Sequence, residues 1–245
     1  MKIQGNGDTN IFFRESAEVS FPSKVEINGI TQSEVKTHYY LDNKEYIIKL
    51  IWDNNDYQNT KCLFKDCNYI KELDLSHFDT SNVIQTDRMF YGCSSLVSLN
   101  LSNFMTSNVE NMGNMFVDCS SLKSLDLSNF VTSKVKYIDN MFRGCSSLVS
   151  LNLSNFIITN FELMSKMFEG CSSLVSLDLS NFRTTNAQYM SEMFKGCSSL
   201  VSLNLPYFEA QSVVNINNMF YGCSSLEYIN LIKVLVIKMY LTKHL

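Results

Sequence analysis

The residues most able to do chemistry are the cysteines, and seven of the eight recur every 26 positions. They are Cys67, Cys93, Cys119, Cys145, Cys171, Cys197 and Cys223, with Cys62 outside the series. Such thiols could bond to one another or ligate a metal, but no Cys-x-x-Cys pair or histidine cluster completes a zinc site. We therefore expect a buried ladder of free thiols and no metal. Disulfides between neighbouring repeats are the alternative.

Catalytic constellations are absent from the sequence. The three histidines, His38, His77 and His244, share no position of the repeat. No glycine-rich phosphate loop, nucleophile elbow or zinc-protease motif occurs. The sequence therefore predicts no enzyme, no catalytic residue and no cofactor.

A second position of the same repeat alternates between Asp and Asn. Its members are Asp74, Asn100, Asp126, Asn152, Asp178, Asn204 and Asn230. In strands stacked about 4.8 Å apart, interleaved Asn would hold the carboxylates about 9.6 Å apart, too far to share one Ca²⁺. The alternation is then either structural, with Asn donating to Asp, or a polar track for a glycan or peptide. Asp126, Asn152 and Asp178 are the candidate binding residues of such a track.

The elements that must position these residues follow from the leucines. Each unit reads L-x-x-L-x-L-x-x-F, as in Leu122, Leu125, Leu127 and Phe130. The first half predicts a short strand, and period-2 alternation turns the residues between the leucines away from the core.

The second half of the unit has a different period. Val109, Met112, Met115 and Phe116 form the stripe of a helix,. Ser107 with Glu110 resembles a capping box, and a later Gly, such as Gly144, suits a left-handed end. We therefore expect a helix of about ten residues in each unit.

Together these patterns predict an α/β fold: a right-handed leucine-rich-repeat solenoid of 26-residue strand-turn-helix units with a parallel sheet on its inner face. Residues 1–43 would form a small β-rich N-terminal cap with an Asn28-Gly29 hairpin turn. Residues 44–69 would be a degenerate capping repeat, in which Trp52 matches Phe78. Six repeats would occupy 70–225. Residues 226–245 would be a divergent seventh repeat and C-terminal end.

One position varies among the units in a way that could mark a contact. The residue after the phenylalanine is apolar in three successive units, at Met105, Val131 and Ile157, and charged in the units on either side. On a solenoid these side chains would form an apolar strip about 10 Å long, two strand spacings. We predict that they are either a binding strip or folded over the core.

The segment from Met141-Phe142-Arg143-Gly144-Cys145-Ser146-Ser147-Leu148 through Phe156 closely resembles the repeat of BspA-like leucine-rich-repeat surface proteins. The resemblance covers roughly residues 60 to 231 and rests on the long exact period. It implies a solenoid and, commonly, a place on the cell surface with a role in adhesion or host contact. The sequence shows no export signal or anchor motif, so the location stays open.

Charge and hydropathy narrow the partners. The net charge is −4 and no basic block predicts nucleic-acid binding,. The apolar tail from Ile229 is interrupted by lysines, so no membrane insertion is expected. We therefore expect a non-enzymatic module for protein–protein contact or cell-surface adhesion. An intracellular scaffold and a carbohydrate-binding Ser/Asn/Asp face are the alternatives. An unprotected last coil could also pair edge to edge with another copy.

Overall fold

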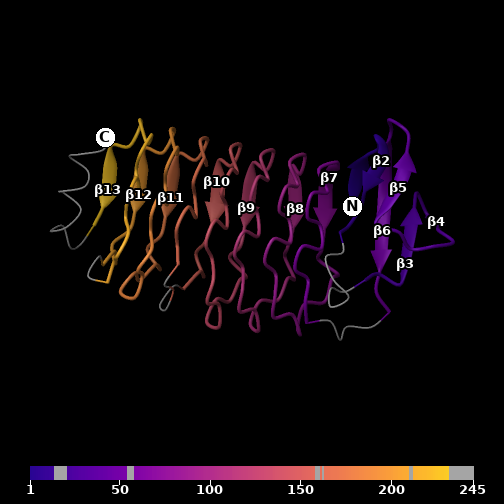
Figure 1. The fold of residues 1–245 in the computed structure, drawn as a ribbon, viewed down its shortest axis with the longest axis horizontal. Coiled ribbons are helices and arrows are strands. Elements are labelled where there is room, and N and C mark those ends of the chain that lie inside the picture. Colours follow the sequence, from indigo (N-terminus) through magenta and orange to yellow (C-terminus); the bar gives the residue numbers. More distant parts are fainter. Residues whose placement is uncertain (14–20, 54–57, 158–160, 162, 210–211, 232–245) are drawn as a thin grey trace.

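The computed structural model describes residues 1–13, 21–53, 58–157, 161, 163–209 and 212–231. Coils follow one another along a single long axis, and the N-terminal strands gather at one end (Figure 1). Within the described residues the regular elements are all strands. The structure is therefore a β-solenoid with a β-rich end.

The described residues of the N-terminal end form six strands: β1 (Lys2–Gln4), β2 (Gly7–Asn10), β3 (Lys24–Ile27), β4 (Ile30–Thr31), β5 (His38–Leu41) and β6 (Glu45–Ile51). The β3–β4 hairpin turns at Asn28 and Gly29, with φ of 49° and 80°, as a tight hairpin turn requires. The predicted hairpin is confirmed. β1 lies antiparallel between β6 and β7, so this end continues directly into the repeat sheet.

Seven parallel strands mark the repeats: β7 (Ile70–Asp74), β8 (Ser98–Asn100), β9 (Ser124–Asp126), β10 (Ser150–Asn152), β11 (Ser176–Asp178), β12 (Ser202–Asn204) and β13 (Tyr228–Asn230). Each pairing joins equivalent residues, as in Leu125 with Leu151 and Leu177 with Leu203. The solenoid with parallel strands is therefore confirmed. Side chains of one kind stack in rows because the register repeats without slippage.

The predicted helix is wrong for the described residues. Backbone amides in the second half of the unit donate to the next coil rather than four residues back: Arg88 N bonds Gly113 O at 3.1 Å, and Phe90 N bonds Met115 O at 2.9 Å. The intervening amides close three-residue turns, as Tyr91 N does to Arg88 O. A helix would need every amide for its own carbonyls.

Left-handed residues explain why the helix does not form. Arg88, Asn114, Asn140, Lys166, Glu192 and Asn218 stand at one repeat position, and all have φ between 55° and 59°. A residue there interrupts any right-handed helix. The expected left-handed Gly is confirmed; Gly144, for example, has φ 74°. It ends a turn, however, rather than a helix. The proposed capping residue Glu110 instead pairs with Lys136 at 2.7 Å.

Two rows of stacked phenylalanines form the centre of the solenoid. In the first row, ring centroids lie 5.3 to 5.8 Å apart and interplanar angles stay at or below 10°; its members are Phe64, Phe90, Phe116, Phe142, Phe168, Phe194 and Phe220. The second row runs from Phe104 to Phe182 with wider spacing. Offset ring contacts add to the large apolar area that each ring buries. Each coil is therefore held to its neighbours by ring packing as well as by hydrogen bonds.

Residues 44–69 follow the repeat only in their second half. Phe64 stacks on Phe90 at 5.8 Å, and Asn59 bridges to Gln85 in parallel. Trp52 contacts Phe78 at 4.8 Å, as the repeat alignment predicts. The strand of this segment, β6, is nevertheless separated from β7 by the inserted β1. Beyond β13, the proposed closing segment lies outside the described residues.

Candidate functional site

The three apolar residues singled out from the sequence are exposed. Met105, Val131 and Ile157 keep 52%, 47% and 57% of their surface accessible. They stand on consecutive coils, at equivalent positions. Of the two interpretations, the one that folds these side chains over the core does not fit this exposure. We call these three residues the apolar strip.

A buried threonine row fixes the backbone of the strip. Thr106 Oγ1 accepts a hydrogen bond from Val131 N at 2.7 Å and donates to Val131 O at 3.0 Å. Thr80 makes the same two bonds to Met105, and Thr132 Oγ1 donates to Ile157 O at 2.8 Å. Each threonine is at least 96% buried. One coil therefore sets the position of the exposed residue on the next.

The Asp/Asn row lies one turn before the strip, on the exposed face of the strands. Asp126 Oδ1 accepts from Ser128 N at 2.9 Å, and Asn152 Oδ1 accepts from Ser154 N at 3.1 Å. In alternate coils, Asp and Asn thus accept the same hydrogen bond from the backbone N–H two residues later. At Asp178, Asn204 Nδ2 also donates to the carboxylate at 2.8 Å, as the structural interpretation of the alternation requires.

These hydrogen bonds also favour the charged form of the carboxyls. Bonds from Ser128 hold the pKa of Asp126 below its ordinary value. At Asp178, burial would raise the pKa, but the bonds from Ser180 and Asn204 together outweigh it and the pKa is lowered. Donors that prefer the ionised carboxylate have this effect. The row therefore carries negative charge at neutral pH.

The thiols of the cysteine row are buried and have low reactivity. Each thiol from Cys93 to Cys223 donates to a phenylalanine carbonyl of the preceding coil, with Sγ–O distances of 3.0 to 3.2 Å. Burial raises the pKa of the Cys145 thiol to about 12 and that of Cys223 to about 11. A protonated thiol is a poor nucleophile and a poor ligand. The described residues contain no group of three or more His, Cys, Asp or Glu able to hold a metal.

Sequence reasoning missed two rows beside these candidates. Val149, Val175 and Val201 are exposed just before β10, β11 and β12. Asn129 Nδ2 donates to the carbonyls of Leu101, Ser102 and Phe104 and so ties two coils together. Both rows could have been found in the sequence, because the valines recur in the segment Leu-Val-Ser-Leu and the asparagines recur in Ser-Asn-Phe.

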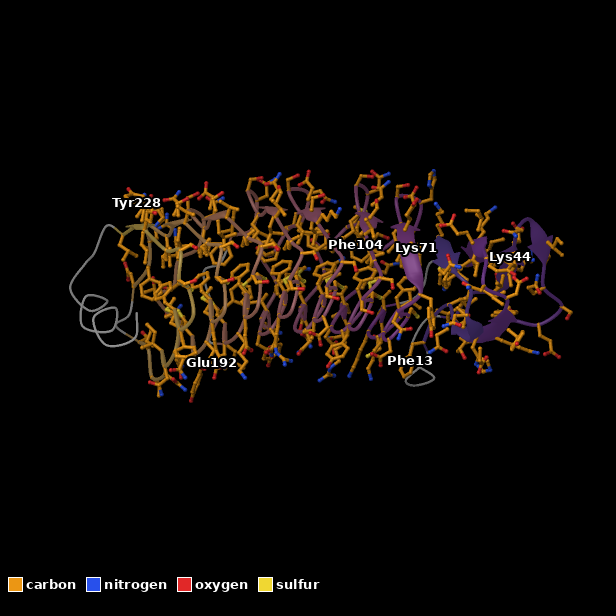
Figure 2. The ribbon with its side chains drawn as sticks, turned by 90° about the horizontal axis from the view of Figure 1, so that it is seen from above. Phe13, Lys44, Lys71, Phe104, Glu192 and Tyr228 are labelled. Carbon is orange, nitrogen blue, oxygen red and sulfur yellow. The ribbon has the colours of Figure 1, made fainter. Side chains whose placement is uncertain are left out.

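The two sides of the stack differ in charge. Tyr228 and Glu192 lie at opposite sides of the coils (Figure 2). Glu192 belongs to an ion-pair network in which Lys195 bonds both Glu192, at 2.6 Å, and Glu169, at 3.4 Å. Tyr228 belongs to the sheet side, which carries the Asp/Asn row together with serines and exposed valines. An apolar strip with polar neighbours is typical of a contact surface.

The fold and these rows define the class: a leucine-rich-repeat solenoid, a kind of protein that typically presents an extended binding surface rather than an active site. The model of the family described as "Mycoplasma protein of unknown function, DUF285" matches residues 58–177 and 149–233. These two ranges together span most of the chain. The chain therefore belongs to this family, in agreement with its resemblance to BspA-like leucine-rich-repeat proteins.

Solved structures also include similar chains. One is a leucine-rich repeat protein from Bacteroides ovatus, 17% identical, with 92% of this chain and 75% of that chain covered and a TM-score of 0.31. Among curated proteins, no significant match was found. In the described part of the chain, no helix has the length and hydropathy to cross a membrane.

Proposed function

We propose that the chain is a non-enzymatic binding module that recognises another protein, and that the apolar strip lies in the contact. The observation that carries this proposal is the exposure of Met105, Val131 and Ile157 on consecutive coils. The hydrogen bonds from the threonine row support the proposal further. They hold the backbone of the apolar strip in place, and a prepositioned surface loses little entropy on binding.

The size of the strip indicates that the contact reaches beyond it. Two coil spacings amount to about 10 Å, whereas a stable interface covers about 800 Å² on each partner. Asp126 and Asn152 lie one turn away and would supply the polar rim that surrounds an apolar centre. A protein is favoured over a glycan because the oxygens of this row already bond the turns at Ser128 and Ser154.

Paired substitutions on one coil test this proposal. Val131 and Tyr137 belong to the same coil and are each 47% exposed, but Tyr137 lies on the row of isolated bridges, away from the strip. Partners are captured from extract of the producing cells with Val131→Asp, Tyr137→Asp or unchanged protein. We expect Val131→Asp alone to lose the specific partner. Equal capture by all three proteins would refute the role of the strip.

The place of contact is a separate proposal. The resemblance to BspA-like surface proteins favours a partner met at the cell surface, and an intracellular scaffold is the alternative. A membrane-impermeant amine reagent applied to intact producing cells distinguishes them, because exposed lysines such as Lys136 would be labelled only on an external protein. Labelling that requires cell lysis would favour the scaffold.

A further inference from the structure

The residues immediately ahead of the strands β9 to β13, which lie side by side along the solenoid (Figure 1), form one row of exposed side chains. The members of the row are Lys123, Val149, Val175, Val201 and Glu227. The three valines keep 53%, 47% and 36% of their surface accessible. We call these five residues the valine row. It is apolar on three consecutive coils, with a cation at one end and an anion at the other.

Backbone hydrogen bonds between coils hold this row in place. Val149 N donates to Lys123 O at 2.8 Å. Val201 N donates to Val175 O at 2.8 Å, and Glu227 N donates to Val201 O at 3.0 Å. Serines stand two positions before and one position after each valine: Ser147, Ser150, Ser173, Ser176, Ser199 and Ser202. Because these neighbours are small, another surface can approach until it touches the valines.

The charges at the two ends of the row are not compensated by ion pairs. Among the ion pairs of the described residues, none involves Lys123 or Glu227. They cannot pair with each other within one chain, because four coil spacings of about 4.8 Å hold them about 19 Å apart. A second row of the same kind, running in the opposite direction, would bring a carboxylate to Lys123 and an ammonium group to Glu227.

We infer that the valine row is a contact between two copies of this chain, which lie face to face with their long axes antiparallel. The two-fold axis passes by Val175, so that Val175 meets the same residue of the second copy. Val149 then meets Val201, and Lys123 meets Glu227. A two-fold contact forms every such pair twice, which gives an apolar centre with two ion pairs at its ends. The valine row is separate from the apolar strip, so this contact does not depend on the function proposed above.

The order of residues in the row selects this arrangement over its rivals. Moving the axis by one coil would place Lys123 or Glu227 opposite Val175, and a charge that loses water without gaining a partner is costly. Parallel copies would place each charge opposite an identical charge. Only the antiparallel arrangement centred on Val175 matches apolar with apolar and cation with anion along the whole row.

The Asp/Asn row, three residues further along each coil, is compatible with the antiparallel arrangement. Asp126 would face Asn230 of the second copy, so alternation again separates the carboxylates. Asp178 alone would face its own equivalent. It is exposed and lies about 10 Å to one side of the valines, about the distance over which salt screens exposed charges.

Sedimentation velocity of the full chain tests the inference. The row is narrower than a standard interface, so we expect a dimer that forms between about 1 and 100 μM; reductant excludes dimers linked by disulfides. Val175→Asp sets two carboxylates on the axis and should weaken association tenfold or more. Tyr137→Asp is the control, because Tyr137 and Val175 are both 47% exposed, and it should dimerise like the unchanged chain. An unchanged chain that is monomeric at about 100 μM would overturn the inference.

Reversed charges test the register. Lys123→Glu and Glu227→Lys should each weaken the dimer about tenfold, because each replaces two opposite-charge pairs by like-charge pairs. The double variant restores opposite charges and should regain the association of the unchanged chain. A double variant no better than either single variant would show that these residues do not meet.

Cross-linking identifies the contact directly. A carbodiimide joins a lysine to a carboxylate without a spacer, and Lys123 and Glu227 of one chain are too far apart to react with each other. We expect a digest of the cross-linked dimer to contain a peptide that joins Lys123 to Glu227. Cross-linked dimers without this peptide would also overturn the inference.

Discussion

Replacing Thr106 by valine tests whether hydrogen bonds between coils hold the apolar strip. The side chain keeps its shape and loses both bonds to Val131, at 2.7 and 3.0 Å. An unpaired, partly buried N–H costs about 1–3 kcal/mol of the free energy of unfolding. Thr106→Ser is the matched control, because it retains the hydroxyl and loses one methyl group, about 0.8 kcal/mol.

Two measurements test this prediction, one of the stability of the whole chain and one of the Val131 amide alone. Urea unfolding followed by circular dichroism should rank the proteins as unchanged, Thr106→Ser and Thr106→Val, in falling stability. Hydrogen exchange at the Val131 amide should accelerate about tenfold or more in Thr106→Val, the factor that corresponds to 1.4 kcal/mol. If Thr106→Val unfolds with the unchanged protein while Thr106→Ser is the less stable, methyl packing rather than hydrogen bonding holds the row.

Three further predictions follow from the rows. Burial raises the pKa of Cys145 to about 12, above the ordinary value of about 9 in the unfolded chain. The free energy of unfolding should therefore fall as pH rises from 9 towards 12, and it should fall less steeply in Cys145→Ala. Parallel curves for the two proteins would contradict this. Gly170→Ala should destabilise by about 1–2 kcal/mol in urea unfolding, because Gly170 has φ 74°; Gly113→Ala, at a glycine without positive φ, is the control. Asp126→Asn should leave stability at pH 7 within about 0.5 kcal/mol, since Asn152 makes the same bond to its turn; a larger loss would show that the charge itself is needed.

The strands and rows could be predicted because they depend on spacing alone. A strict 26-residue period forces Leu125 beside Leu151 whatever the rest of the unit does. The same holds for the stacking of Phe142 on its neighbours. Spacing also placed the apolar strip and the Asp/Asn row, although their binding roles stay predictions.

The second half of the unit could not be predicted in the same way. Val109, Met112, Met115 and Phe116 are all buried, so the stripe correctly identified core residues. Consecutive tight turns, however, produce nearly the same spacing of buried side chains as a helix. The deciding residues are the left-handed ones. Asparagines at this position, such as Asn114, are of a type that tolerates the conformation, but Arg88 and Lys166 at the same position give no sign of it. Hydrogen bonding to the next coil, rather than local propensity, selects it.

The hydrogen bonds from the threonine row to the apolar strip could have been predicted from the sequence, although they were not. Thr80, Thr106, Thr132 and Thr184 recur one period or two apart, and a threonine that the repeat buries needs a hydrogen-bond partner. The insertion of β1 between β6 and β7 could not be foreseen, because β1 pairs with residues more than forty positions away.

Hydrogen-bonded partners on neighbouring coils lie 25 to 29 positions apart in the rows described above, close to one period of 26 residues, and this spacing has an evolutionary consequence. Removing residues 122–147, one whole period, would join Ser121 to Leu148 and shorten every row by one member while leaving all others aligned. Losing a single residue within a coil would instead break the register between that coil and its two neighbours. Variation in such a gene should therefore occur in multiples of 78 nucleotides, and the length of the molecule can change without redesign of its surface.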